Sequence, residues 1–144
     1  MKTKDKRRGQ AGVTLIEMLV VVIIIALFAT LVAPNMFRQG DKAKIVAARV
    51  QINNFEQALT QYKMNTGTFP TTEQGLEALR TRPGGVNGWD GPYLRKEIPV
   101  DPWMHPYVYK FPGEHGDEPD IISYGLDGQP NGEGLNADIV NWKN

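Results

Sequence analysis

The hydrophobic pattern begins with one unbroken apolar run of 21 residues, from Val13 to Ala33, in which Glu17 is the only charged residue. As a helix, this run would be about 31 Å long, close to the hydrocarbon thickness of a bilayer. It is longer than the apolar core of a secretory signal peptide. Basic residues are denser before the run than directly after it, which indicates a cytoplasmic N-terminus. We therefore predict a transmembrane helix over residues 13–34 and a head, residues 35–144, outside the cytoplasm.

Beyond Pro34 the pattern becomes amphipathic. Apolar residues recur at alternating steps of three and four, at Ile45, Ala48, Ile52, Phe55, Leu59 and Tyr62. This spacing predicts a helix over residues 41–65 with one apolar face. We expect that face to pack on a small head, because three heptads are marginal for a coiled coil. Pro34 and Gly40 predict a kink or a melted stretch between the two helical segments, and Gly67 ends the second one.

Residues 65–144 are divided into short segments by 12 Gly and 9 Pro, yet they hold all three Trp. Disordered chains lack such aromatic residues, so we predict a folded, loop-rich head. Thr71 and Gln74 have the spacing of a capping box, which predicts a short helix to about Arg80. Two strands are predicted, over residues 107–111 and 120–124.

Charge and cysteine content exclude several classes of function. The formal net charge is zero, but residues 1–12 carry five basic residues against one acid, so the rest of the chain is acidic. An acidic head argues against nucleic-acid binding, which needs a basic face. The absence of cysteine excludes a disulfide framework, a thiolate zinc site and a cysteine nucleophile.

A carboxylate inside a membrane helix costs about 2.5–3.5 kcal/mol unless it is paired, so Glu17 is interpreted as functional. It stands in the sequence Gly12-Val13-Thr14-Leu15-Ile16-Glu17, directly after the basic leader. This arrangement resembles the processing signal of type IV pilins and pseudopilins. The resemblance implies a leader, residues 1–12, that a prepilin peptidase removes between Gly12 and Val13. It also implies that Val13 is then N-methylated and that Glu17 pairs with the terminal amine of a neighbouring subunit. Two positions depart from the family pattern, which prefers Phe or Met at Val13 and a basic residue at Ala11.

The stretch from Asp127 to Asp138 is rich in oxygen ligands and has no soft ones, which suits Ca²⁺ better than zinc. Gln129, Pro130 and the strand-like residues before the stretch exclude an EF-hand. A calcium loop of another kind and a solvated polar turn both remain open at this point.

Five motifs resemble the major, G-type pseudopilin family of the type II secretion system within the type IV pilin-like superfamily. They are WDGPYL (89–94), DPWMHPY (101–107), PGEHGD (112–117), DIISYGLDGQPNGEG (120–134) and NADIVNW (136–142). The resemblance implies an α+β, type IV pilin-like fold with a long N-terminal helix on a small antiparallel sheet and a C-terminal calcium loop. It implies Ca²⁺ ligands at Asp127 and Asp138, with main-chain oxygens near Tyr124 and Gln129. Where some members have a second aspartate this chain has Ala137, so Asn136 or a main-chain oxygen would replace one ligand.

The same resemblance implies a structural subunit of a periplasmic pseudopilus that drives protein export across the outer membrane. The implied partners are other copies of the chain, minor pseudopilins, the prepilin peptidase and an inner-membrane assembly platform. The implied location is the bacterial inner membrane, crossed once, with the head in the periplasm. The alternative is a type IV pilin used for adhesion or motility.

An enzyme is a weaker hypothesis. His105 and His115, together with Asp101, Asp117 and Asp120, could form a metal or acid–base cluster. Both histidines lie in Pro- or Gly-flanked segments outside any catalytic motif, so we interpret them as surface or turn-stabilising residues.

Overall fold

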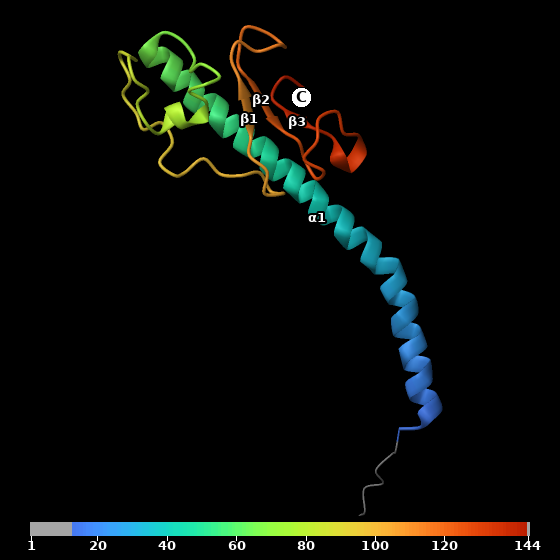
Figure 1. Cartoon of the computed structure of the whole chain (residues 1–144). Helices are drawn as coiled ribbons and strands as arrows, with labels where there is room; N and C mark the ends of the chain where they lie inside the picture. The colour runs from blue at the N-terminus through green and yellow to red at the C-terminus, as the bar shows by residue number, and fades with distance from the viewer. Residues whose placement is uncertain (1–12, 144) are drawn as a thin grey trace, which may run out of the picture. The chain divides into compact units, whose positions relative to one another are not determined.

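The computed structural model describes residues 13–143 of the chain, and the side chains of residues 31–39 fall outside that description. The described residues form an α+β structure with one long helix and a three-stranded antiparallel sheet (Figure 1). In chain order the elements are α1 (Leu15–Thr66), the 3-10 helix η1 (Leu76–Leu79), β1 (Val108–Lys110), β2 (Asp120–Ser123), the 3-10 helix η2 (Gly134–Asn136) and β3 (Ile139–Val140). The chain divides into two compact units, Met1–Gln39 and Gly40–Asn144.

We expected a kink or a melted stretch between Pro34 and Gly40; helix α1 is continuous over its 52 residues, so the melted alternative is wrong. Proline removes only one backbone donor, and the hydrogen bonds of the turns on either side still hold the helix. At its C-terminal end the N–H of Gly67 donates to the carbonyl of Lys63 at 2.8 Å. Gly67 has a φ of +87°, a left-handed conformation that glycine adopts readily, so the predicted end of the helix is confirmed.

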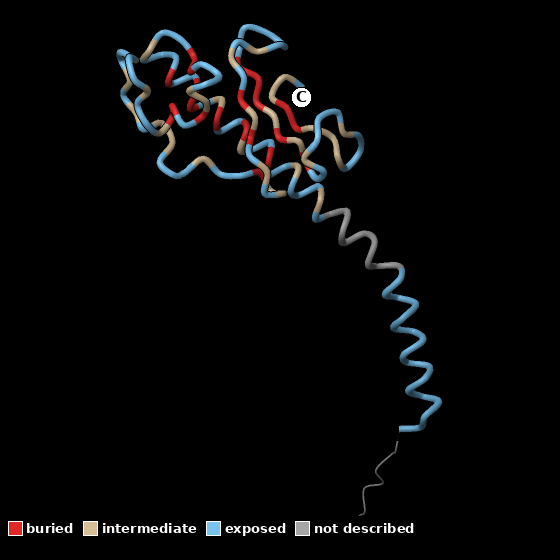
Figure 2. Tube along the Cα trace, in the orientation of Figure 1, coloured by how far each residue is buried: buried red, intermediate tan, exposed pale blue. Residues whose placement is uncertain are grey.

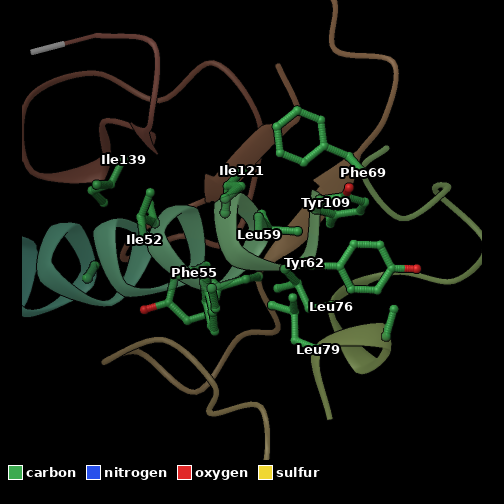
Figure 3. Packing of buried hydrophobic residues seen from close by; sticks show 14 residues of the cluster. Ile52, Phe55, Leu59, Tyr62, Phe69, Leu76, Leu79, Tyr109, Ile121 and Ile139 are labelled. Carbon is green, nitrogen blue, oxygen red and sulfur yellow. The ribbon is translucent and has the colours of Figure 1, made fainter. Parts of the chain in front are cut away.

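From Gly40 onward, one face of α1 forms the centre of the head. Figure 3 shows this face surrounded by side chains from η1, the loops and the sheet. Ile45 of the predicted stripe is partly buried, and Ala58 is buried although it was not predicted. The other buried residues of this face are those of the stripe, namely Ala48, Ile52, Phe55, Leu59 and Tyr62. The Phe55 ring meets the Tyr107 ring edge-on, with centroids 5.1 Å apart, and Ile121 from β2 is completely buried in the same cluster. The prediction that this face packs on the head is confirmed.

The sheet lies against α1 with the strand order β1-β2-β3 (Figure 1), and buried residues concentrate where the two layers meet (Figure 2). Val108 pairs with Ile122 across β1 and β2, and Ile122 pairs with Val140 across β2 and β3. Both predicted strands are confirmed, although each is shorter than expected. β3 was not predicted, because two residues are too few to show an alternating pattern.

The segment after Gly67 has the predicted cap but not the predicted helix. The side-chain oxygen of Gln74 accepts from the N–H of Thr71 at 3.0 Å, and the Thr71 hydroxyl accepts from the N–H of Gln74 at 3.3 Å. Both bonds of the capping box are therefore present. The turn does not continue as an α-helix because Gly75 has a φ of +57°, outside the right-handed helical region. Only the four-residue η1 follows.

Candidate functional site

The residues predicted to be processed and to assemble lie at the start of α1. Gly12 is outside the described residues, whereas Val13 is 60 % exposed just before the helix. Glu17 lies in the first turn, where its N–H donates to the Thr14 hydroxyl at 3.3 Å. A carboxylate in this turn also interacts favourably with the positive end of the helix dipole. The described structure thus places Val13 and Glu17 about one turn apart at the end of the helix.

The described residues of the N-terminal part of α1 are exposed (Figure 2), and almost all of them are apolar. Its exposed large residues are Leu15, Ile16, Met18, Leu19, Val20, Val21, Val22, Ile23, Ile24, Ile25, Leu27 and Phe28. An apolar patch of this kind on a single chain marks a surface that another protein or a membrane covers. Within the described residues, no helix has both the length and the apolarity needed to cross a membrane. Residues 31–34 of the predicted span lie outside the described side chains.

The residues predicted to bind calcium all lie in the loop that joins β2 to β3, which we call the C-terminal loop (residues 124–138). Tyr124 directly follows β2, Asn136 ends η2 and Asp138 directly precedes β3. Two glycines allow this loop to fold on itself. A Cβ at Gly132 would lie 1.9 Å from the Asn136 carbonyl oxygen, and one at Gly125 would lie 3.1 Å from the Ala137 carbonyl oxygen. The structure therefore brings the start of the loop against its end.

The hydrogen bonds of the two aspartates test whether a cation fits there. One oxygen of Asp138, Oδ2, accepts from the N–H of Asn131 at 2.9 Å. The other, Oδ1, is buried and has no hydrogen-bond partner among the described residues. Burying such an oxygen without a partner is costly, and a cation would remove the cost. Asp127 lies on the exposed side of the loop, where Oδ1 accepts from the N–H of Gln129 at 3.1 Å.

No group of three or more His, Asp or Glu side chains suited to a metal gathers within the described part of the chain. A site in the C-terminal loop would therefore combine Asp127 and Asp138 with main-chain and amide oxygens. Oxygen ligands of this kind are the ones that Ca²⁺ takes, six to eight at a time. The residues present fit calcium, with the unpartnered Asp138 oxygen as the structural observation in its favour.

Asp101 is the centre of a buried polar network that the sequence does not reveal. The residue is 2 % exposed, and its Oδ1 accepts from the N–H groups of Trp103 and His105 at 3.0 and 2.8 Å. Its Oδ2 accepts from the hydroxyl of Ser123, which is fully buried, at 2.6 Å. The Asp101-Pro102 sequence is a local signal for a turn. Nothing local identifies Ser123, which lies 22 residues away.

His115 and Asp120 form a second pair. Nδ1 of His115 lies 2.9 Å from Oδ2 of the buried Asp120, and the His115 ring stacks on Trp142 with centroids 3.7 Å apart. The same Asp120 oxygen accepts from the N–H of Glu114. A hydrogen bond from Lys110 lowers the pKa of Glu114. His115 lies in a bend and Asp120 is the first residue of β2, so this pair holds the turn before β2 against the strand.

Three tyrosines of the core have raised pKa values. Burial, with the charge of Asp101 adding to it, raises the pKa of Tyr107 to about 12. Burial also raises the pKa of Tyr109, whose hydroxyl donates to the Pro70 carbonyl at 2.8 Å. The pKa of Tyr62 is raised by burial first and by Tyr93 second. These hydroxyls remain protonated in the folded head through the physiological range.

Two family models match the chain. The first, described as type II secretion system (T2SS), protein G, matches residues 35–142, and the second, the prokaryotic N-terminal methylation motif, matches residues 7–33. The chain belongs to the type II secretion system protein G family. The chain is similar to curated members of this family along almost their whole length. The type II secretion system core protein G of Pseudomonas aeruginosa is 42 % identical over 96 % of this chain and 99 % of its own. That of Vibrio cholerae is 44 % identical over 95 % of this chain and 94 % of its own.

A solved structure extends the likeness to three dimensions. The crystal structure of the major pseudopilin from the type 2 secretion system of enterohaemorrhagic Escherichia coli matches with a TM-score of 0.65 and 36 % identity. The match covers 76 % of this chain and 91 % of that one. The family resemblance and the pilin-like α+β fold are therefore confirmed, and a type IV pilin of adhesion or motility is not favoured. The family is one of structural pseudopilins.

Proposed function

We propose that this chain is a structural subunit of the type II secretion pseudopilus and polymerises through its N-terminal helix to drive protein export across the outer membrane. The observation that carries this proposal is the joint match of the protein G family over residues 35–142 and the methylation motif over residues 7–33. The exposed apolar part of α1 supports it, because bundling with other copies would remove that surface from water.

Assembly begins with processing. A prepilin peptidase removes residues 1–12 by cutting between Gly12 and Val13, and Val13 becomes the methylated N-terminus. The match to the methylation motif supports this step, since it includes both residues. Val13 is exposed directly before the first turn of α1, and a peptidase could reach it there.

Glu17 then acts as the assembly residue. Cleavage creates a terminal amine on Val13, and the Glu17 carboxylate of a neighbouring copy pairs with that amine as the helices bundle. A carboxylate in an apolar surface needs such a partner, because leaving it unpaired in the membrane or in the filament core is costly. The pair therefore fixes the register of one helix against the next.

Before assembly the chain crosses the inner membrane once, with the N-terminus in the cytoplasm and the head in the periplasm. After assembly it contacts other copies, minor pseudopilins and the inner-membrane assembly platform. The proposal is structural and includes no catalytic role for either histidine.

The head also binds one Ca²⁺ ion in the C-terminal loop. Asp127 and Asp138 supply the charged oxygens, and main-chain oxygens near Tyr124 and Gln129 complete the site with Asn136. The unpartnered Oδ1 of Asp138 supports this assignment. When bound, the ion would neutralise two carboxylates and hold the ends of a glycine-rich loop together.

Assembly is tested in cells of a type II secretion host that lack their own major pseudopilin and produce this chain instead. We expect the mature protein to lack residues 1–12 and to carry one additional methyl group by mass spectrometry. Gly12→Leu should leave the leader attached. Glu17→Ala should be processed and inserted normally but should abolish filaments and secretion. Glu97→Ala removes an exposed head carboxylate and should behave as wild type.

Either of two results would contradict this scheme. Normal filaments and secretion from the Glu17→Ala chain would show that the carboxylate has no part in assembly. A mature mass that is the same for Gly12→Leu and wild type would place the cleavage elsewhere.

The calcium assignment is tested by thermal unfolding of the full chain in detergent, in excess CaCl₂ and in EGTA. A ligand that binds only the folded state stabilises it by about 2.7 kcal/mol at a hundredfold excess over Kd. Wild type should therefore melt several degrees higher in calcium, more so than in magnesium. Asp127→Ala and Asp138→Ala should melt low in both conditions. An equal melting temperature of wild type in CaCl₂ and in EGTA would contradict the calcium site and would show that the loop is a solvated polar turn.

A further inference from the structure

The Asp101 network continues into the C-terminal loop through His105. Asp101 holds the backbone N–H of His105, and Nδ1 of the His105 ring lies 3.1 Å from the carbonyl oxygen of Gly125. A carbonyl oxygen can only accept, so Nδ1 carries the hydrogen and donates it. The buried Asp101 carboxylate therefore fixes the backbone of His105, and the His105 side chain in turn binds the backbone of the C-terminal loop at Gly125.

The same ring also touches the loop at a second point. A Cβ on Gly128 would lie 2.9 Å from Cε1 and 3.0 Å from Nε2 of His105, so the ring lies directly against the Gly128 backbone. Gly128 stands between Asp127 and Gln129, two of the proposed calcium ligands, and has a φ of +65°. Its backbone needs glycine both for this conformation and for the approach of the ring.

Ser123 makes a third contact with the backbone of the C-terminal loop. Its hydroxyl donates to Asp101 and accepts from the N–H of Gly125 at 3.3 Å. The N–H and C=O of one trans peptide point in opposite directions. Holding the N–H of Gly125 on Ser123 therefore turns the carbonyl oxygen of Tyr124, another proposed ligand, away from Ser123.

We propose that Asp101, Ser123 and His105 are positioning residues that preorganise the C-terminal loop for calcium, an inference that rests on the calcium site proposed above. Asp101 anchors the network, Ser123 orients the Tyr124 carbonyl, and His105 holds the loop at Gly125 and Gly128. None of the three is a ligand. Main-chain oxygens bind Ca²⁺ well only when the backbone already presents them, and loss of an outer partner of a metal site typically weakens binding 10–100-fold.

The test is a calcium titration of the full chain in detergent, stripped with EGTA and followed by calorimetry with CaCl₂. His105→Ala should raise the Kd about tenfold or more. His105→Asn places an amide N–H near the position of Nδ1, so it should recover part of the lost affinity. The matched control is His115→Ala, which removes the other turn histidine and should leave the Kd as in wild type. Melting in EGTA confirms that each variant is folded.

Ser123→Ala provides an independent variant, because it removes the acceptor for the Gly125 N–H and leaves the His105 ring in place. Its Kd should also rise. A wild-type Kd for folded His105→Ala, or for folded Ser123→Ala if His105→Ala does not fold, would overturn the inference. An equal rise in His115→Ala would also overturn it, because the effect would then be general loosening of the head. If wild type itself binds no calcium, both the calcium site and this inference fail, whereas the proposed role in the pseudopilus stands on the separate Glu17 experiment.

Discussion

Met104 holds a backbone conformation that its side chain disfavours. Its φ is +73° and its side chain is 76 % exposed, so contacts of the side chain offset little of the strain. A non-glycine residue in this region costs about 1–2 kcal/mol. Met104→Gly should therefore raise the free energy of unfolding by about 0.5–1 kcal/mol, after the larger chain entropy of unfolded glycine is subtracted.

Met64 is the matched control for this substitution. It is similarly exposed, at 79 %, but lies in the last turns of α1. Met64→Gly should lower the free energy of unfolding by up to about 1 kcal/mol, because glycine is a poor helix former. Denaturant unfolding of the full chain in detergent, followed by Trp fluorescence, measures both values. The same sign for both substitutions would contradict the account of Met104.

The pKa of Tyr107 predicts how the head responds to alkali. Its folded value is about 12, against an ordinary 10.0, so between these values the folded state keeps a proton that the unfolded state has lost. The stabilisation is complete below pH 10 and is lost as the pH rises towards 12. The raised pKa values of Tyr62 and Tyr109 act in the same direction.

We therefore expect the melting temperature to fall steeply from pH 10 upward, with a shallower fall in Tyr107→Phe, which lacks the titrating hydroxyl. Spectrophotometric titration of the phenolate should show late ionisation that coincides with unfolding. Constant stability from pH 8 to 11 would show that these hydroxyls are not buried as described.

At the scale of the elements, the sequence predicted secondary structure best where the hydrophobic pattern repeats over several helical turns. The stripe from Ala48 to Tyr62 repeats with the helical period over several turns, so its burial follows from spacing alone. Gly67 and the cap at Thr71 were also predictable, because each acts through its own neighbours in the chain.

The elements that could not be predicted depend on distant partners or on very short segments. β3 has only two residues and exists because β2 pairs with it. The segment after Thr71 has a helical cap but turns away at Gly75. The Asp101–Ser123 bond joins residues 22 apart in sequence, and the unpartnered oxygen of Asp138 is visible only once the loop is folded. The candidate ligands came from the family resemblance, whereas the network behind them came from the structure.

The packing of α1 against the rest of the head should contribute strongly to the stability of the head. Phe55 is completely buried and packs against Tyr107, so Phe55→Ala should lower the free energy of unfolding by about 3–5 kcal/mol. Asn53→Ala, on an exposed face of the same helix, should change it by less than about 0.5 kcal/mol. Trp fluorescence during denaturation reports on the head alone, because all three Trp lie in residues 65–144. A small effect of Phe55→Ala would mean that α1 does not form the centre of the head.

At the scale of the whole molecule, the two units have opposite surfaces. The unit from Gly40 onward buries its apolar residues in its own core, whereas the described part of the first unit exposes them. An exposed apolar surface of this kind is unfavourable for an isolated chain in water. A filament subunit, in contrast, needs an apolar surface through which identical copies pack together. This division of surfaces fits a pseudopilus subunit that has a folded head and an apolar helix available to other copies.

The most direct test of this account is electron cryomicroscopy of filaments from cells that produce the chain together with its secretion machinery. The account predicts a filament whose core consists of the N-terminal parts of α1, with Glu17 of one subunit beside the Val13 amine of its neighbour and the heads outside. A filament built through the heads alone, with the N-terminal helices outside the core, would contradict it.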